Sequence, residues 1–299
     1  MKVLVVCGAT ATGKTKLAVD CALKLDTEII SADSQLVYKG LNIGTAKPTR
    51  DETRGVKHHL IDVVEPTEQF SVSDYSKLAE PILKRLISEN KTPIVCGGTG
   101  FYVNSLLYDL SYGSTAADTE IRNRYETLLN DKGKDYLFGC LERVDPATAE
   151  KLHPNDTKRV IRALEIYKLS GIRKSDINDG KKAKYEYVAV AIDYPRDELY
   201  ERINKRVDDM FSEGLVDEVK NLLSKGIDEK FQCMQAIGYK EVLFGLRNGL
   251  NHSTMSDIIK QNTRRYAKRQ ITFFKKLEGL VWLKPEEATC EFVTGLLNE

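Results

Sequence analysis

Eight residues near the start of the chain, GATATGKT at 8–15, have the G-x-x-x-x-G-K-[ST] spacing of a phosphate-binding loop. An apolar run at 3–7 precedes them, and the segment after them, 16–25, repeats apolar residues at helical spacing. A strand, a glycine-rich turn and a helix N-terminus together aim backbone N–H groups and the positive end of a helix dipole at one point. Lys14 adds a full positive charge, and Thr15 offers a hydroxyl to a phosphate-bound Mg²⁺. The sequence therefore predicts a bound di- or triphosphate, without deciding whether a phosphate is transferred.

Two further polar groups follow strand-like runs. Asp33 comes after the run 28–32, and Thr99 lies in the turn GGTG at 97–100, after the run 92–96. A carboxylate at a strand end can act as a general base, hold Mg²⁺, or simply cap a turn. The Thr99 hydroxyl fits either a role facing the phosphate or an ordinary glycine-rich turn.

The elements that must position these groups alternate between strand and helix patterns over the first hundred residues. The strand-like runs are short and apolar, at residues 3–7, 28–32, 60–64 and 92–96. A helical stripe at 78–87 contains Pro81, which predicts a kink or a late helix start. Such alternation predicts an α/β fold, a parallel sheet flanked by helices like that of P-loop NTPases. Ligands bind beyond the carboxyl ends of the strands in these sheets, so the loop, Asp33 and Thr99 are expected to share one rim.

The strand pattern disappears from 114 to 186, which predicts a helical insertion. The run YVAVAI at 187–192 reads as a buried strand that returns to the sheet, and the chain after it is mostly helical. Residues 1–113 and 187–299 are therefore predicted to form one discontinuous core.

Two basic helix faces could bind a polyanion or could simply be solvated. Arg159 and Arg162 lie three residues apart, on one face of a helix. The long last helix, expected from 254 to 277, carries six basic and no acidic residues between 264 and 276. The net charge is only +1, from 45 basic and 44 acidic side chains, so any footprint for nucleic acid must be local.

Other features argue against whole classes of protein. The six cysteines contain no C-x-x-C pair, which argues against a structural zinc site. His58 and His59 are adjacent and point different ways, so we expect a packed or hydrogen-bonded pair rather than metal ligands. No run approaches the roughly 20 apolar residues of a membrane span, and the first run is too short for a signal peptide. These features predict a cytoplasmic protein, and the lack of an apolar interface stripe predicts a monomer.

The chain also lacks the sequence features that usually accompany transfer of a γ-phosphate. No apolar run ends in a D-E pair, and no arginine-rich lid is evident. The loop could therefore hold a diphosphate that departs as a leaving group.

Seven segments, taken in order, resemble the tRNA dimethylallyltransferases, which are also called tRNA isopentenyltransferases. The segments are GATATGKT at 8–15, DSQLVYKGLNIGTAKP at 33–48, HHLID at 58–62, GGTGFY at 97–102, NDTKRVIRALEI at 155–166, MQAIGYKE at 234–241 and TRRYAKRQITFF at 263–274. Together they span nearly the whole chain. The resemblance implies that a dimethylallyl group moves from dimethylallyl diphosphate to N6 of the adenosine 3′-adjacent to the tRNA anticodon, and that diphosphate is released.

The resemblance also implies roles for residues around the loop. Asp33 would be the general base for the N6 amine, and Thr99 would position the amine and the bridging oxygen. Lys14 and Arg206 would stabilise the charge that develops on the leaving group, and Thr15 would hold Mg²⁺. The implied diphosphate-binding residues are Gly8, Ala9, Thr10, Ala11, Thr12, Gly13, Lys14, Thr15 and Arg206.

The implied tRNA contacts fall in two regions. The segment 33–36 would line a pocket for an extruded adenosine, and the insertion would grip the anticodon arm by its backbone. The implied contacts are Asp33, Ser34, Gln35, Leu36, Thr99, Arg122, Lys158, Arg159, Val160, Ile161 and Arg162. Many family members have glutamine where this chain has Leu36, and here Gln35 precedes it, so either side chain could contact the target base.

Three alternatives stay open. An adenylate isopentenyltransferase would act on free AMP, ADP or ATP, although a mononucleotide needs neither a helical insertion nor two basic faces. A P-loop small-molecule kinase would transfer phosphate from ATP. A non-catalytic RNA-binding module would leave the phosphate-binding loop without a purpose.

Overall fold

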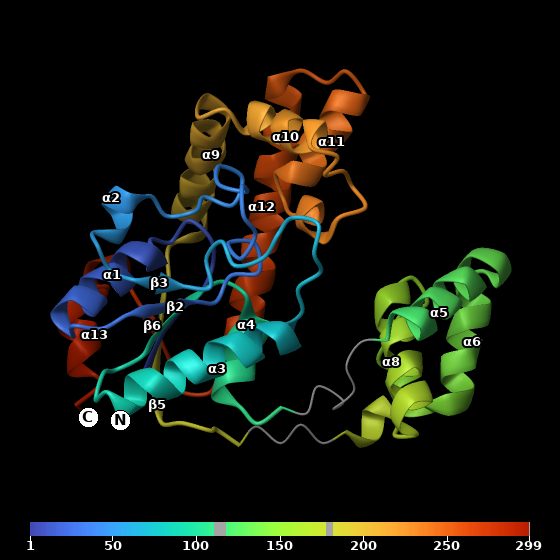
Figure 1. The fold of residues 1–299 in the computed structure, drawn as a ribbon, viewed down its shortest axis with the longest axis horizontal. Coiled ribbons are helices and arrows are strands. Elements are labelled where there is room, and N and C mark those ends of the chain that lie inside the picture. The colour runs from blue at the N-terminus through green and yellow to red at the C-terminus, as the bar shows by residue number, and fades with distance from the viewer. Residues whose placement is uncertain (111–117, 178–181, 299) are drawn as a thin grey trace. The chain divides into compact units, whose positions relative to one another are not determined.

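A computed structural model describes residues 1–110, 118–177 and 182–298 of the chain. It divides into two compact units (Figure 1). Unit 1 comprises residues 1–107 and 183–299, and unit 2 comprises residues 108–182. The predicted insertion, 114–186, starts and ends a few residues later than unit 2.

Unit 1 contains a six-stranded sheet in which every strand pair is parallel. The strand order is β3-β2-β4-β1-β5-β6, with β1 at Val3–Cys7, β2 at Ile29–Ser31, β3 at His58–His59, β4 at Ile94–Gly97, β5 at Tyr187–Ile192 and β6 at Leu280–Leu283. Strand β1 is fully buried because β4 and β5 pair with its two edges and helices flank the sheet (Figure 1). The predicted α/β fold is confirmed. Strand β6 was not predicted, because its four residues are too few to separate from the helix before them.

The apolar run at 60–64, expected as a strand, is not one. Leu60 and Asp62 have φ angles of 63° and 55°, in the left-handed region that interrupts an extended chain. Val64 forms only an isolated bridge with Tyr38. Strand β3 is therefore confined to the two histidines before this run.

Some helices of unit 1 pack on the sheet, and others pack mainly on further helices. The helices are α1 (Lys14–Lys24), α2 (Arg50–Thr53), α3 (Val72–Ser88), α4 (Gly100–Leu107), α9 (Arg196–Ser212), α10 (Leu215–Ser224), α11 (Tyr239–Arg247), α12 (His252–Phe274) and α13 (Cys290–Gly295), with short 3₁₀ turns at Gln232–Gln235 and Pro285–Glu287. Each helix in the described ranges is too short or too polar to span a lipid bilayer.

Helix α3 starts well before Pro81, so a late start is wrong. Ser71 and Asp74 form a capping box: the Ser71 hydroxyl accepts the Asp74 N–H, and the Asp74 carboxylate accepts the Ser71 N–H at 3.0 Å. This cap fixes the helix start at Val72, and the helix continues through the proline to Ser88.

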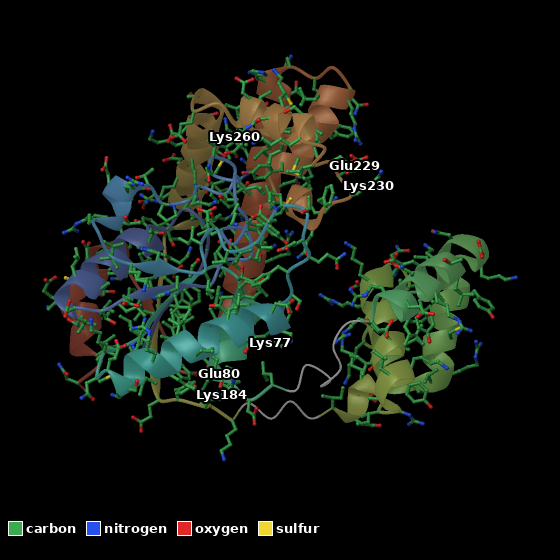
Figure 2. The ribbon with its side chains drawn as sticks, viewed as in Figure 1. Lys77, Glu80, Lys184, Glu229, Lys230 and Lys260 are labelled. Carbon is green, nitrogen blue, oxygen red and sulfur yellow. The ribbon has the colours of Figure 1, made fainter. Side chains whose placement is uncertain are left out.

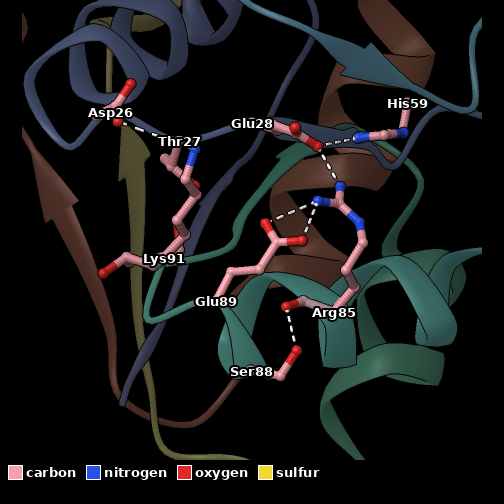
Figure 3. A network of polar contacts seen from close by, with 9 residues as sticks. Asp26, Thr27, Glu28, His59, Arg85, Ser88, Glu89 and Lys91 are labelled. Carbon is pink, nitrogen blue, oxygen red and sulfur yellow. Dashed lines mark hydrogen bonds and ion pairs between the residues drawn. The ribbon is translucent and has the colours of Figure 1, made fainter.

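A polar network ties the outer strands to α3 (Figure 3). The Glu28 carboxylate, just before β2, lies 2.5 Å from His59 Nε2 and also accepts a hydrogen bond from Arg85 of α3. Burial by itself raises the pKa of Glu28, but the hydrogen bonds from His59 and Arg85 outweigh burial and hold that pKa below its ordinary value. His58 Nδ1 lies 2.9 Å from the Val56 carbonyl oxygen. The two histidines are thus hydrogen-bonded residues, as predicted.

Helices α9 and α12 pack against each other beside the phosphate-binding loop. Ile203 of α9 and Ala267 of α12 are buried in one apolar cluster with Ala9 of the loop. Lys260 of α12, which is labelled in Figure 2, pairs with Asp208 of α9, with Nζ 2.6 Å from Oδ1. These contacts hold two helices from the last third of the chain against its first loop.

The named elements described in unit 2 are helical: α5 (Thr119–Lys132), α6 (Lys134–Val144), α7 (Pro146–Ala149), α8 (Thr157–Ser170) and a 3₁₀ turn at Lys174–Asp176. The buried Glu165 carboxylate lies 2.9 Å from Nη2 of Arg122 and from Nη1 of Arg162, and accepts the Asp118 N–H at 2.8 Å. Burial raises the pKa of Glu165, but the two arginines outweigh burial and lower it. The elements described in unit 2 are thus helical, and they contain a buried, ion-paired carboxylate.

Candidate functional site

The loop between β1 and α1 closes on its own backbone. Gly8 and Gly13 adopt φ angles of 121° and 84°, which favour glycine. The Thr12 hydroxyl donates to the Ala9 carbonyl at 3.0 Å, and Lys14 Nζ donates to the same carbonyl. The loop thus holds the Lys14 ammonium group against its own backbone. Lys14 is the first residue of α1, and an anion is favoured at a helix N-terminus.

Helix α9 brings two arginines to this loop. Arg206 Nη1 donates to the Thr10 hydroxyl at 3.2 Å, and Arg202 Nε donates to the Ala11 carbonyl at 2.9 Å. Burial lowers the pKa of Arg206, and burial together with the nearby Arg206 charge lowers the pKa of Lys14. Two cations that are partly desolvated and close together favour an anion as their common partner.

A cavity of about 620 Å³ opens beside the loop and contains these cations. Its basic lining residues are Lys14, Lys16, Lys47, Arg202, Lys205 and Arg206. Thr15 also lines it and is exposed in the first turn of α1. Glu52, Asp209 and Glu213 line the same cavity, so three acidic side chains accompany its six basic ones. We call this space the loop cavity.

The segment after β2 and the turn after β4 lie against each other because these strands are neighbours in the sheet. Thr99 Oγ1 accepts the Ser34 N–H at 3.0 Å, and the Thr99 N–H donates to the Ala32 carbonyl at 3.0 Å. A Cβ on Gly97 would lie 2.1 Å from the Ala32 oxygen, so only glycine permits this approach.

Asp33 Oδ1 accepts the Gln35 N–H at 2.9 Å, which orients the carboxylate.

A second cavity, of about 310 Å³, lies next to the loop cavity, and Arg206 lines both. Thr10, Asp33, Ser34 and Gln35 form part of its polar wall. Its apolar wall comes from Ile203, Val207, Met210, Ala236, Ile237 and Ile259. We call it the central cavity. It places a carboxylate, a cation and an apolar surface around one space.

Some of the site residues predicted from the sequence line the central cavity, and others do not. Leu36 and Thr99 are outside the set that lines the central cavity, and Thr99 reaches that set through Ser34. The Gln35 side-chain oxygen is buried without a hydrogen-bond partner among the described residues. Of the two candidates for base contact, Gln35 is thus the one that lines the cavity.

In unit 2 the predicted residues separate into three groups. Lys158 and Arg159 are exposed. Arg122 and Arg162 are bound to Glu165, although each stays about a third exposed, at 37% and 28%. Val160 and Ile161 are 1% and 5% exposed in the core of unit 2, which leaves their side chains unavailable to a ligand. Their burial follows from the helical period, because they face opposite to the basic residues.

Sequence reasoning missed several side chains around the two cavities. Lys47, Arg202, Lys240, Thr263, Tyr266, Arg269 and Gln270 either line a cavity or bond to the loop. Four of them belong to α12, whose basic residues predict only a polyanion-binding or solvated face. Only the contact of α12 with α9 reveals which of its residues face the site.

Comparison with known proteins gives a consistent result. The family model described as IPP transferase matches residues 36–277. The tRNA dimethylallyltransferase of Acetivibrio thermocellus is 45% identical over 289 residues, covering 95% of this chain and 92% of that protein. The tRNA dimethylallyltransferase of Alkaliphilus oremlandii is 43% identical over 283 residues, covering 94% and 90%.

Solved structures agree. The tRNA isopentenylpyrophosphate transferase of Bacillus halodurans is similar with a TM-score of 0.74 and 40% identity, covering 99% of this chain and 96% of that one. A eukaryotic dimethylallyltransferase acting on tRNA has a TM-score of 0.81 and 30% identity, covering 96% of this chain and 74% of that one.

Proposed function

The chain belongs to the IPP transferase family of tRNA dimethylallyltransferases, and we propose that it moves a dimethylallyl group from dimethylallyl diphosphate to N6 of the adenosine 3′-adjacent to the tRNA anticodon. The central cavity is the observation that carries this proposal. It brings Arg206, which also lines the loop cavity, together with the Asp33 carboxylate and an apolar wall, and a prenyl diphosphate beside an adenosine needs all three. A γ-phosphate donor would leave the apolar wall without a purpose.

The loop and Arg206 would hold the diphosphate as it departs. The allylic C–O bond breaks with negative charge moving to the bridging oxygen, while the allylic carbon carries positive charge. Lys14 and Arg206 are fixed by hydrogen bonds to the loop before the substrate binds, so little reorganisation accompanies this charge shift. The apolar wall of the central cavity would shield the allyl group from water.

Asp33 would accept the proton that N6 loses as the new C–N bond forms. An exocyclic amine is a weak nucleophile, so proton removal must accompany its attack. The hydrogen bond from the Gln35 N–H to Oδ1 orients the carboxylate at the wall of the central cavity. Thr99, hydrogen-bonded to Ser34, would place the amine against the bridging oxygen.

Mg²⁺ would enter with the diphosphate and offset charge on its oxygens. Across the described parts of the chain, no cluster of three or more His, Cys, Asp or Glu side chains could hold a metal ion. The exposed Thr15 hydroxyl in the loop cavity fits as one ligand of an ion that is already bound to phosphate. This donor set supports a substrate-borne ion over a resident one.

Unit 2 would bind the anticodon arm through its exposed cations. Glu165 uses one side of Arg122 and of Arg162, and a guanidinium has further N–H donors for a phosphate. Lys158 is exposed to solvent, and Arg159 is 68% exposed although its Nε lies 3.4 Å from Asp156 Oδ2. We also propose a cytoplasmic monomer, because the proposed substrate is tRNA and the sequence contains no apolar interface stripe.

A labelling experiment tests the transfer. The protein is incubated with dimethylallyl diphosphate labelled in the prenyl group, Mg²⁺, and either tRNA or AMP. We expect label in tRNA, at the adenosine 3′ of the anticodon, and none when that adenosine is replaced by guanosine. Label in AMP alone would make the chain an adenylate isopentenyltransferase, and label in neither would overturn the proposal.

The Lys158→Ala, Arg159→Ala double variant should weaken tRNA binding and reduce its dependence on salt. Each lost phosphate contact removes about one counterion from the binding equilibrium, so the slope of log K against log salt should fall by up to about 2. Filter binding at several salt concentrations measures it. Lys132→Ala, an exposed lysine at the end of α5, is the matched control. An unchanged slope in the double variant would return this face to ordinary solvated surface.

A further inference from the structure

Gln270 of α12 joins two catalytic segments that are far apart in the sequence. Its side chain is 5% exposed. Oε1 accepts the Thr10 N–H of the phosphate-binding loop at 2.9 Å, and Nε2 donates to the Gly98 carbonyl at 2.9 Å. One amide group therefore bridges the loop after β1 and the turn after β4.

The surroundings show that this bridge is built into the fold. A Cβ on Gly98 would lie 2.2 Å from Gln270 Nε2, so the amide occupies the space that any other residue would need there. Strands β1 and β4 are neighbours that pair Cys7 with Gly97, so the two bridged segments start level with each other. Beyond the sheet, the Gln270 amide sets the distance between the phosphate-binding loop and the turn after β4.

The same helix also brings Tyr266, one turn before Gln270, near the hydroxyl that would position the acceptor. The side chains of Thr99 and Gln270 both lower the pKa of its phenol, although burial outweighs them. Burial raises the pKa of Tyr266, so its phenol stays protonated. Thr10, at the other end of the bridge, receives Arg206 on its hydroxyl. The hydrogen bonds thus run from a diphosphate-binding arginine through Thr10 and Gln270 to Gly98, the residue before Thr99.

We propose that Gln270 is a positioning residue that fixes the separation between the diphosphate-binding loop and the turn carrying Thr99, and so aligns the allylic carbon with the N6 amine. This inference rests on the proposed function. It also means that the Thr10 N–H serves the bridge, while the Thr10 hydroxyl serves Arg206. The other loop N–H groups and the N-terminus of α1 are left for the diphosphate.

Misalignment has a chemical signature. When the C1–O bond breaks, the allyl cation is captured either by N6, which loses its proton, or by water. Capture by water forms a C–O bond and releases a proton, so dimethylallyl diphosphate and water yield dimethylallyl alcohol and diphosphate. A variant that lets the donor and acceptor drift apart should favour the alcohol. Loss of folded protein would instead lower both products in proportion.

The test is the ratio of dimethylallyl alcohol to prenylated tRNA formed by Gln270→Met, which keeps the side-chain length but cannot bridge. We expect single-turnover transfer to fall about 10²-fold, because misplacement by about 1 Å has that effect. We also expect the ratio to rise, with tRNA affinity unchanged. Leu86→Ala, a buried α3 residue outside both bridged segments, is the control for lost stability and should leave the ratio unchanged.

A second variant tests separately the two hydrogen bonds of Gln270, to the Thr10 N–H and to the Gly98 carbonyl. Gln270→Glu can still accept from Thr10, but its carboxylate faces the Gly98 carbonyl without a proton to donate, so we expect a ratio no better than that of Gln270→Met. An unchanged ratio in Gln270→Met, or a wild-type ratio in Gln270→Glu, would overturn the positioning role. Absence of transfer by the wild-type protein would instead count against the proposed function, so the two failures are distinguishable.

Discussion

Replacing Asp33 by asparagine is expected to lower the single-turnover rate of prenyl transfer by about 10²–10⁴, the usual contribution of a general base. The N6 amine must lose a proton as the C–N bond forms, and an amide cannot take it. Asparagine keeps an oxygen for the Gln35 N–H, which Asp33 Oδ1 accepts at 2.9 Å. The loss should therefore appear in the chemical step, measured by rapid quench with enzyme in excess over labelled tRNA, and not in tRNA affinity.

Asp33→Ala provides the comparison, because it removes both the base and the acceptor for Gln35. If the base role is right, both variants lose most of the rate. If Asp33→Asn transfers at nearly the wild-type rate while Asp33→Ala does not, the carboxylate only stabilises the turn, and the base must be sought elsewhere on the wall of the central cavity.

Arg206→Met should slow transfer by about 10²–10³, the range seen when one preorganised donor to a developing negative charge is removed. Methionine preserves much of the buried volume in α9 but removes the charge and the hydrogen bond to the Thr10 hydroxyl. The affinity for dimethylallyl diphosphate should fall as well, because Arg206 contributes positive charge to the loop cavity. Titration with dimethylallyl diphosphate under single-turnover conditions measures both effects.

Arg196→Met is the matched control in the same helix. Arg196 is the first residue of α9, and its guanidinium carbon lies 5.1 Å from the centre of the Tyr200 ring. It lines neither cavity. It should leave the rate and the diphosphate affinity unchanged. Equal losses in both variants would point to damage to α9, and a normal rate in Arg206→Met would remove Arg206 from the leaving-group site.

The candidate site was predictable where a local pattern fixes the geometry. The loop at 8–15 could be recognised because a strand, two glycines and a helix start lie within a few residues of one another. Asp33 and Thr99 could be assigned to one rim because parallel strands end at the same edge. Arg206 came only from a resemblance, since nothing in the pattern of α9 separates it from Arg202.

The tRNA contacts in unit 2 were harder to predict, because the sequence shows where basic residues lie but not which of them are exposed. Arg162 looked like a free cation on a solvated face, but Glu165, three residues later on the same helix, is fully buried and binds it. Val160 and Ile161 belong to the same segment but pack inside unit 2. A basic helical segment shows where charge is abundant, and burial of its neighbours decides which of those charges reach solvent.

The sequence by itself determined the sheet class, the phosphate-binding loop and the order of the elements, because hydrophobic period and glycine spacing act over a few residues. Only the tertiary structure decided which side chains complete the site. Gln270 lies 260 residues from Thr10 and 172 from Gly98, and its pattern in the sequence is that of any polar residue on an amphipathic helix. Its two hydrogen bonds exist because α12 packs on α9 against the loop, and such long-range contacts depend on the whole fold.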